Sequence, residues 1–314
     1  MKKALLLLVA TAFSWVTLTS ENTSVPALQG RISLSGAFAL YPLSVKWAEE
    51  FRKVYPGVKI DISAGGAGKG VTDALAGVTD IGLLSRDLTP EELKKSAVAF
   101  AVAKDAVVPV VSSSNPYLKE LLAKGIKKSV LNNIFITGDV KSWGQVGVKS
   151  NAPLHVYTRS DAAGAAETWA KYFGKKQEDL QGVAVFGDPG LATAVKKDPV
   201  GIGFNNIVYV YDSKTKKATN GIVPLPIDIN NNGKIDANES FYGNIDQLVD
   251  AIADGRYPSP PGRDLYFLTK GVPKNPVVKE FIKWVLTDGQ KYVREQGYIN
   301  LSGAKINAGL NKLK

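Results

Sequence analysis

The stretch AVVPVVSSSNP at residues 106–116 decides the fold of this chain. Its apolar part, Ala106–Val111, is followed by serines, an asparagine and a proline, and this order indicates a buried strand that ends in a polar turn. We interpret it as a strand that crosses from one lobe to another. A second apolar run, Leu265–Thr269, can pair with it and carry the chain back. Two crossings predict two lobes with a cleft between them.

Runs with the character of strands alternate with amphipathic segments along the chain, which predicts an α/β fold with a sheet flanked by helices in each lobe. The elements expected in the first lobe are strands at Ile32–Leu34, Val58–Ile62 and Ile81–Leu84, with helices near 42–54 and 71–76. The middle section shows the same alternation of strands and helices, at Leu118–Leu122, Leu154–Thr158, Gly164–Phe173 (a helix), Val183–Phe186 and Ile202–Tyr211. We therefore assign residues 30–108 and 265–314 to lobe one and residues 109–264 to lobe two.

Apolar residues recur at helical spacing near the end of the chain, in Val277–Leu286 and then Gly289–Gln296. This periodicity predicts a pair of C-terminal helices with one apolar face. We expect that face to pack on lobe one.

The first twenty residues have the composition of an export signal. Lys2 and Lys3 precede an apolar run, Ala4–Phe13, and a small-residue segment, Thr17–Ser20. We predict a signal peptide at residues 1–20 that is cleaved to give a periplasmic protein. The chain has no cysteine, which excludes disulfides, thiol catalysis and a lipid anchor on a mature N-terminal cysteine.

The formal net charge is +10, or about +8 once Lys2 and Lys3 leave with the leader. This excess favours anionic partners. The lysines are scattered and are not interleaved with aromatic residues, as they are on nucleic-acid-binding surfaces. We therefore expect no nucleic-acid partner, and we interpret most of the lysines as a solvated basic face.

Three segments share one layout, in which a strand runs into a small-residue loop that opens a helix: Ser35–Phe38, Ser63–Gly70 and Arg159–Ala165. Each would aim free backbone N–H groups at one point, and helix N-termini carry partial positive charge. Converging on a cleft, such turns would form a cage for an oxyanion, with Arg159 as a permanently charged contact. A single glycine turn is weak evidence, because any α/β protein uses such turns. Gly70 stands where a Walker A loop needs Ser or Thr, which argues against nucleotide hydrolysis.

These segments, taken in order, resemble the phosphate-binding proteins of bacterial phosphate ABC transporters, which have the type II periplasmic binding protein fold. The similarity runs from about Gly30 to Ser302. It is carried by Ser35–Ala37, Tyr41–Leu43, Lys46–Ala48, Ala74–Gly77, Asp80–Gly82, Ser85–Arg86, Arg159–Asp161, Gly201–Phe204, Tyr257–Pro258, Leu265–Lys270, Gly289–Gln290 and Gly297–Tyr298. The resemblance implies a monomeric receptor that delivers an oxyanion to a membrane permease.

The chain departs from the family's pattern at the positions that usually grip phosphate. Phe38 or Ala39 stands where Thr is common, Ala67 where Ser is common, and Ser85 where some members have an acid. The Gly-Ser-Gly-Thr run that usually follows the arginine is Ala162–Ala165 here. The anion-binding residues that the resemblance and the turns together suggest are Ser35, Gly36, Ala37, Phe38, Gly66, Ala67, Gly68, Ser85, Arg86, Arg159, Asp161, Ala163, Gly164 and Ala165.

Main-chain amides could hold phosphate, arsenate, molybdate, tungstate or sulfate, and the sequence does not rank these ligands. A carboxylate beside the anion would favour one that still carries a proton, such as phosphate over sulfate. Asp161 is the candidate for that role. The alternative is that Asp161 caps the helix that follows Ala162.

Residues 228–239, DINNNGKIDANE, match the twelve-residue EF-hand calcium loop at every constrained position. The expected ligands are Asp228, Asn230, Asn232, the carbonyl of Lys234, Asp236 through water, and Glu239. Pro224 and Pro226 argue against a helix leading into the loop, which predicts an isolated structural site rather than a paired sensor. The alternative is a polar Asn-Gly turn with incidental acids.

Two other functions remain open. The only histidine, His155, could belong to a hydrolase site, but no nucleophile motif accompanies it, so we expect no enzyme. A calcium-stabilised surface or adhesion protein could reuse the same fold without delivering a solute.

Overall fold

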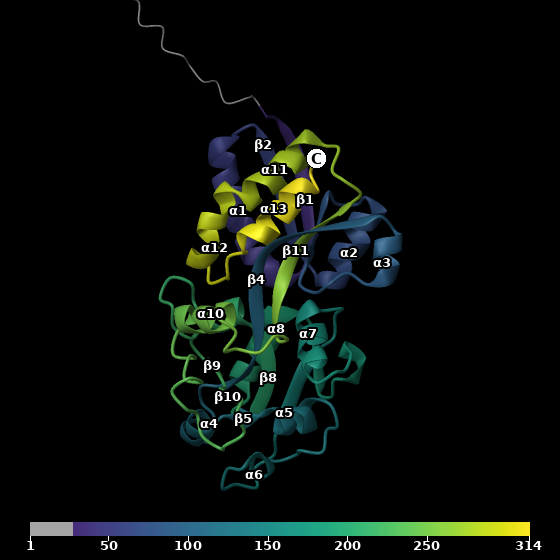
Figure 1. Cartoon of the computed structure of the whole chain (residues 1–314). Coiled ribbons are helices and arrows are strands. Elements are labelled where there is room, and N and C mark those ends of the chain that lie inside the picture. The colour runs from purple at the N-terminus through teal and green to yellow at the C-terminus, as the bar shows by residue number, and fades with distance from the viewer. Residues whose placement is uncertain (1–27) are drawn as a thin grey trace, which may run out of the picture.

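The computed structural model describes residues 28–314, so the leader predicted at residues 1–20 lies outside the described residues. Two lobes lie one above the other in Figure 1, joined by long strands. The paired strands of the described chain follow the order β2-β1-β3-β11-β4-β8-β6-β7, with β9 added beside β4. No helix within residues 28–314 is long and apolar enough to cross a membrane.

Lobe one is built on three parallel strands, β1 (Gly30–Gly36), β2 (Val58–Ala64) and β3 (Ile81–Leu84). The N-terminal half of the lobe also contains η1 (Phe38–Leu40), α1 (Tyr41–Val54), α2 (Ala67–Ala76) and α3 (Pro90–Lys94). The C-terminal segments α11 (Pro276–Leu286), η3 (Asp288–Gln290), α12 (Lys291–Glu295) and α13 (Gly303–Asn311) return to this lobe. Apolar faces of α1 and α11 meet in its core, where Phe51 lies edge-on to Phe281. The expected packing of the C-terminal helices on lobe one is therefore present.

Two strands carry the chain between the lobes. β4 (Ala97–Ser112) pairs antiparallel with β11 (Gly262–Lys270) in lobe one and with β8 in lobe two. The crossing segment expected at Ala106–Val111 lies within β4. We expected a separate sheet for each lobe, but the strand order is continuous because β4 serves both lobes.

Lobe two holds the strands β6, β7, β8 and β9 and a separate two-stranded pair of β5 with β10. Its elements are α4 (Leu118–Lys124), β5 (Ile126–Lys127), α5 (Lys128–Phe135), α6 (Trp143–Val146), β6 (His155–Arg159), α7 (Gly164–Tyr172), η2 (Gln177–Asp179), β7 (Val183–Val185), α8 (Gly187–Lys197), β8 (Gly201–Asn206), α9 (Ile207–Val210), β9 (Ile222–Pro224), β10 (Ile227–Asp228) and α10 (Ile245–Ala253). The segment at Leu118–Leu122 is helical, and the apolar run Ile202–Tyr211 is a strand only as far as Asn206, after which it turns into α9.

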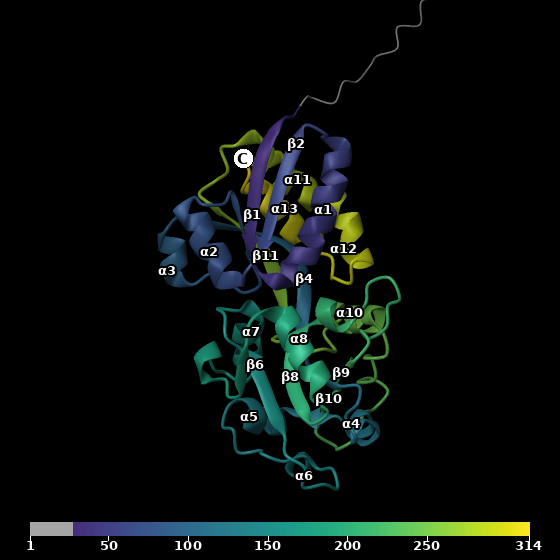
Figure 2. The same ribbon diagram turned by 180° about the vertical axis from the view of Figure 1, so that it is seen from behind.

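The parallel strands place the predicted turns at the cleft. In parallel sheets the carboxyl ends of the strands share one edge, where ligands usually bind. The ends of β1, β2 and β3 lie at one edge in lobe one, and those of β6 and β7 lie together in lobe two. The helices α7 and α8 lie at the end of lobe two that faces lobe one, as Figures 1 and 2 both show.

Candidate functional site

Two of the three predicted turns touch each other across the cleft. The amide of Gly68, at the start of α2, donates to the carbonyl of Ala162 at 3.0 Å. A β-carbon on Gly68 would lie 2.6 Å from the Ala162 β-carbon, and one on Gly164 would lie 2.1 Å from the Ser85 hydroxyl. Glycine is required at both points because the backbones approach too closely for a side chain.

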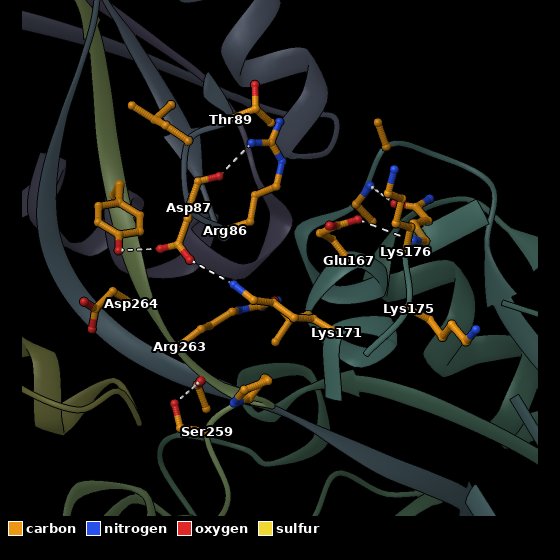
Figure 3. A pocket seen from close by; sticks show the side chains of 18 of the residues that line it. Arg86, Asp87, Thr89, Glu167, Lys171, Lys175, Lys176, Ser259, Arg263 and Asp264 are labelled. Atoms are coloured by element: carbon orange, nitrogen blue, oxygen red, sulfur yellow. Dashed lines mark hydrogen bonds and ion pairs between the residues drawn. The ribbon is translucent and has the colours of Figure 1, made fainter. Parts of the chain in front are cut away.

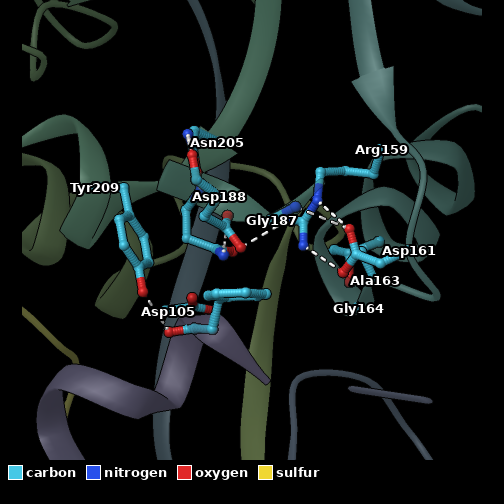
Figure 4. A network of polar contacts seen from close by, with 12 residues as sticks. Asp105, Arg159, Asp161, Ala163, Gly164, Gly187, Asp188, Asn205 and Tyr209 are labelled. Carbon is cyan, nitrogen blue, oxygen red and sulfur yellow. Dashed lines mark hydrogen bonds and ion pairs between the residues drawn. The ribbon is translucent and has the colours of Figure 1, made fainter. Parts of the chain in front are cut away.

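Arg159, at the end of β6, lies at the centre of a buried polar cluster (Figure 4). Its Nε and Nη2 donate to the two carboxylate oxygens of Asp161 at 2.9 and 2.6 Å, and its Nη1 donates to Asp188 at 2.7 Å. The side chains of Arg159, Asp161 and Asp188 are 1, 7 and 2 % exposed. Burial lowers the pKa of the guanidinium, but the two carboxylates outweigh it and hold that pKa above its ordinary value. The cluster therefore carries a permanent positive charge between two acids.

Asp161 does not cap the helix that follows it. The N-cap of α7 is Ala163, whose own side chain makes no capping hydrogen bond, so the alternative that Asp161 caps this helix is wrong. Asp161 instead accepts the amide of Gly187, the first residue of α8, at 3.1 Å. The same carboxylate thus serves a guanidinium and a helix N-terminus, which both favour its negative charge.

Asp188 also belongs to this cluster, although the sequence did not predict it as a site residue. Its carboxylate accepts from Asn206 at 2.5 Å, and its carbonyl accepts from Asn205 at 2.9 Å. The segment Val183–Gly190 has the same strand-to-helix layout with small residues as the three predicted turns. That repeated layout is the signal that could have identified it.

The first predicted turn contributes an aromatic ring, and one of its amides already has an acceptor within the chain. The Ala37 amide donates to the carbonyl of Leu83 at 2.8 Å, so the expectation that it is free is wrong. A β-carbon on Gly36 would lie 2.4 Å from the same carbonyl, so this turn is pressed against β3. The Ser35 hydroxyl donates to Asp73 at 2.7 Å and is also engaged. The guanidinium carbon of Arg159 lies over the Phe38 ring, 5.6 Å from the ring centroid.

The other two turns also bind acceptors within the chain. The Ala163 amide donates to the side-chain oxygen of Gln177 at 3.0 Å, and the Gln177 side chain donates to the carbonyl of Asp161 at 2.6 Å. Gly66 lies beside the Asp161 carboxylate, where its φ of +90° and the close approach both require glycine. Ala67 and Ala165 are buried in the first turns of α2 and α7.

Ser85 and Arg86 have different surroundings. Ser85 is buried against Gly164 of the opposite lobe. Arg86 donates to both carboxylate oxygens of Glu92, at 2.9 and 2.7 Å. Arg86 lines the cavity between the lobes, but its guanidinium is already paired with the Glu92 carboxylate.

A cavity of about 940 Å³ opens between the lobes beside these turns. Figure 3 shows its charged lining, in which Lys171 of lobe two donates to Asp87 of lobe one at 3.2 Å. The wall of the cavity includes Ala162, Ala163 and Gln177. The cavity therefore reaches the Ala163 amide, which donates to the Gln177 side chain. The basic residues of the lining are Arg86, Lys104, Lys171, Lys175, Lys176, Arg263 and Lys305, and the acidic ones are Asp87, Glu167, Glu178 and Asp264.

A second buried arginine links the hinge to the turn. Arg263 of β11 lies opposite Asp105 of β4 and donates to its carboxylate at 2.9 Å. It also donates to the carbonyl of Gly164 at 2.5 Å and to the Thr168 hydroxyl at 3.0 Å. Burial raises the pKa of Asp105 to about 6, although Arg263 opposes the shift. Neither residue was predicted from the sequence, where a charge within an apolar strand was the available signal.

His155 lies on the surface and forms no part of the cluster. Its Nδ1 lies 2.7 Å from Asp198, which also accepts from the Tyr157 hydroxyl at 2.8 Å. Burial raises the pKa of Asp198, but the hydrogen bonds from His155, Tyr157 and Val200 outweigh it and hold that pKa below its ordinary value. His155 is half exposed, and its hydrogen-bond partner within residues 28–314 is this acid.

The two lobes, the paired crossing strands and the polar turns at the cleft define a binding protein of the two-lobed α/β class. The model of a family described as the PBP superfamily domain matches residues 21–289, and the chain belongs to this family. That family consists of receptors and not of enzymes.

Curated relatives match most of the chain. It is 27% identical over 285 residues to the phosphate-binding protein PstS of Bacillus subtilis, covering 90% of this chain and 84% of the relative. It is 27% identical over 320 residues to PstS of Pseudomonas aeruginosa, covering 93% and 90%.

Solved structures show the same fold. An ABC-type phosphate transport receptor from Vibrio cholerae superposes with a TM-score of 0.62 at 22% identity, covering 86% of this chain and 100% of that one. A high-affinity periplasmic phosphate-binding protein, PfluDING, bound with phosphate, gives a TM-score of 0.65 at 14% identity, covering 89% and 92%.

Proposed function

We propose that this chain is the extracytoplasmic solute-binding component of an ABC transporter and that it takes phosphate or a related oxyanion in the cleft between its lobes. Family membership and the names of the relatives support the transport role. The convergence of turns from both lobes beside the buried Arg159 is the observation that carries the ligand class. Small residues and helix N-termini together favour an anion, and Arg159 offsets one of the two acidic charges beside them.

The anion would bind by replacing acceptors that the chain now supplies. Gln177 holds the Ala163 amide and lines the cavity, so a ligand that enters through the cavity meets this side chain first. Rotation of Gln177 would free the amide for a ligand oxygen. The ring of Phe38 would cover one side of the site, because it already lies over Arg159.

Asp161 gives the site a means of selection. A carboxylate beside the ligand accepts a hydrogen bond from an oxyanion that still carries a proton, and it repels one that does not. Phosphate is monoprotonated or diprotonated near neutral pH, whereas sulfate is not protonated. Phosphate is therefore the first ligand to test.

The partner that follows from this role is a membrane permease, to which each lobe would dock. A receptor of this kind works as a monomer outside the cytoplasm, in agreement with the leader predicted at residues 1–20. The calcium-stabilised scaffold remains the competing function, because the amides of Gly68 and Ala163 already have partners in the chain.

Calorimetry of the mature protein against phosphate, arsenate, sulfate, molybdate and tungstate tests the proposal, with calcium present and after chelation. We expect a sub-micromolar response to at least one anion. Arg159→Ala should remove most of that affinity. Arg256→Ala, which breaks an exposed ion pair with Asp254 and a contact over the Phe241 ring, should leave it unchanged. If folded protein gives no binding heat with any of the five anions, the calcium-stabilised scaffold would be the favoured function.

A milder variant covers the case in which Arg159→Ala does not fold. Gln177 is half exposed and takes no part in the ion pairs of Arg159. Replacing it by Ala uncovers the Ala163 amide and also removes the hydrogen bond to the Asp161 carbonyl. We expect roughly two- to tenfold tighter anion binding from Gln177→Ala, the net worth of one hydrogen bond. Unchanged affinity would place the ligand away from this amide.

A further inference from the structure

The loop at residues 228–239 lies in lobe two, away from the cleft. It follows β10, which pairs in parallel with β5, and the two strands lie near the far end of lobe two, beside α4 (Figure 1). The amide of Ile235 donates to the carbonyl of Ala123 at 2.9 Å, which fixes the loop to the end of α4. Gly125 leaves room for this contact, because a β-carbon there would lie 2.4 Å from the Ile235 side chain.

The main chain of the loop is wrapped around its own polar side chains. Asp228 accepts the amides of Asn232 and Gly233 at 3.1 and 2.8 Å. Glu239 accepts the amides of Ile229 and Asn230 at 2.9 and 3.0 Å. Gly233 has a φ of +83°, as the sharp turn at the sixth position of the loop requires. The first and last acids of the loop therefore both point inward.

Polar groups of the loop also meet at one point. The side-chain amides of Asn230 and Asn232 both donate to one oxygen of Asp236, at 2.9 and 2.6 Å. Lys234 forms an ion pair with the other oxygen at 3.0 Å on the exposed side. Positions 3, 5 and 9 of the motif are thus gathered in space as well as in sequence.

Hydrogen bonds within the loop satisfy the oxygens of Asp228 and Glu239, but they do not balance the negative charges of these two acids. Asp228 is 1 % exposed and Glu239 is 2 % exposed, so both carboxylates are almost fully removed from water. Within residues 28–314, neither has a Lys, Arg or His within ion-pair distance, and Lys234 contacts Asp236 instead. Two buried anions without a cation are costly in free energy, and a bound metal ion is one of the ways in which proteins balance them.

We propose that residues 228–239 form a structural calcium site. The direct ligands are oxygens of Asp228, Asn230, Asn232, the Lys234 carbonyl and Glu239, with Asp236 acting through a water. No three Asp, Glu, His or Cys side chains within residues 28–314 are close enough to hold a metal by themselves. An EF-hand loop does not need three, because amide, carbonyl and water oxygens complete the shell.

Calcium suits this loop better than magnesium or zinc. All the donors are oxygens, whereas zinc prefers nitrogen and sulfur. A loop that supplies donors from six positions matches the six to eight ligands of Ca²⁺, and Mg²⁺ holds its waters and requires a tighter octahedron. The site would tie β10 to the end of α4 and to β5 without reaching the cleft. Calcium is therefore expected to stabilise lobe two and to leave anion binding unchanged.

Calorimetric titration of the chelator-treated mature protein with CaCl₂, and separately with MgCl₂, tests the site. We expect one Ca²⁺ per chain with a Kd of ~10⁻⁴ to 10⁻³ M or tighter, the range of extracellular modules, and at least tenfold weaker Mg²⁺ binding. Failure of wild-type protein to bind Ca²⁺ would overturn the proposal, whatever the result with oxyanions.

Variants locate the ion. Glu239→Gln should abolish Ca²⁺ binding, and Asn232→Ala, at an exposed position, should weaken it at least tenfold even if the buried variant does not fold. Asp139→Asn removes one exposed acid from the same lobe and should bind like wild type. Equal Ca²⁺ affinity in Asn232→Ala and Asp139→Asn would show that any bound ion lies outside the loop and would overturn the proposal.

Discussion

The Arg159 cluster in the cleft and the loop at residues 228–239 use the same groups in opposite ways. In both, buried carboxylates accept main-chain amides from glycine-containing turns. In the cleft, the guanidinium of Arg159 lies between the two acids and offsets one of their two negative charges within the chain. In the loop, Asp228 and Glu239 have no such cation among the described residues. Residues 28–314 supply one cation to the two acids of the cleft and none to these two acids of the loop, so a metal ion is the natural partner in the loop.

The largest effect is expected from removing the cation of the cleft. Arg159→Met keeps an unbranched chain beneath Phe38 but leaves Asp161 and Asp188 buried without their partner. Breaking a buried pair in this way costs about 3–5 kcal/mol of unfolding free energy. Urea denaturation measures it, with Arg256→Met as the exposed control at about 0–1 kcal/mol. A loss below 1 kcal/mol in Arg159→Met would mean that the cluster does not depend on this charge.

A smaller effect is expected from a methyl group at the contact between the lobes. Gly164→Ala places a β-carbon against Ser85, and overpacking of this kind costs about 1–3 kcal/mol. The lobes should also separate, which small-angle scattering would detect as a larger radius of gyration. Gly303→Ala is the matched control, because Gly303 also begins a helix but has open space around it. Equal behaviour of the two variants would argue against a tight contact at Ser85.

Removal of calcium should shift the melting temperature by a few degrees. At a tenfold excess of Ca²⁺ over its Kd, ligand binding stabilises the folded state by about 1.4 kcal/mol. For a chain of this size chelation should lower Tm by roughly 2 to 3 °C. Differential scanning calorimetry measures the shift, and Asn232→Ala, with its weaker Ca²⁺ binding, should shift by less than about a third as much. An equal Tm for wild type with and without Ca²⁺ would remove the contrast between the two regions.

The smallest effect concerns the turn of the loop alone. Gly233→Ala forces a side chain into the left-handed region at a φ of +83°, with nothing within 4 Å to clash, and this strain costs about 1 kcal/mol. Gly77→Ala, at a φ of +76° in equally open space in lobe one, should cost the same in chelator. With Ca²⁺ present, Gly233→Ala should lose more unfolding free energy relative to wild type than it does in chelator, because strain at the turn misaligns the calcium ligands. Denaturation in both conditions measures the difference.

Much of the fold could be predicted from local pattern. Apolar alternation predicted β1, β2, β3, β6 and β11, and helical spacing predicted α11. Such elements depend on which side chains share one face, a property that neighbouring residues in the chain determine. The continuity of the sheet was not predicted, because nothing in the run Ala106–Val111 reveals that its strand begins at Ala97 and serves both lobes.

The sequence by itself determined the crossing strands, the glycine turns that the close approaches require, and the order of oxygen donors in residues 228–239. The tertiary structure alone decided which amides are engaged, through Gln177 and Leu83, and which acids face Arg159. A hydrogen bond between segments depends on distance and direction in three dimensions, and residues far apart in the chain carry no local sign of that pairing.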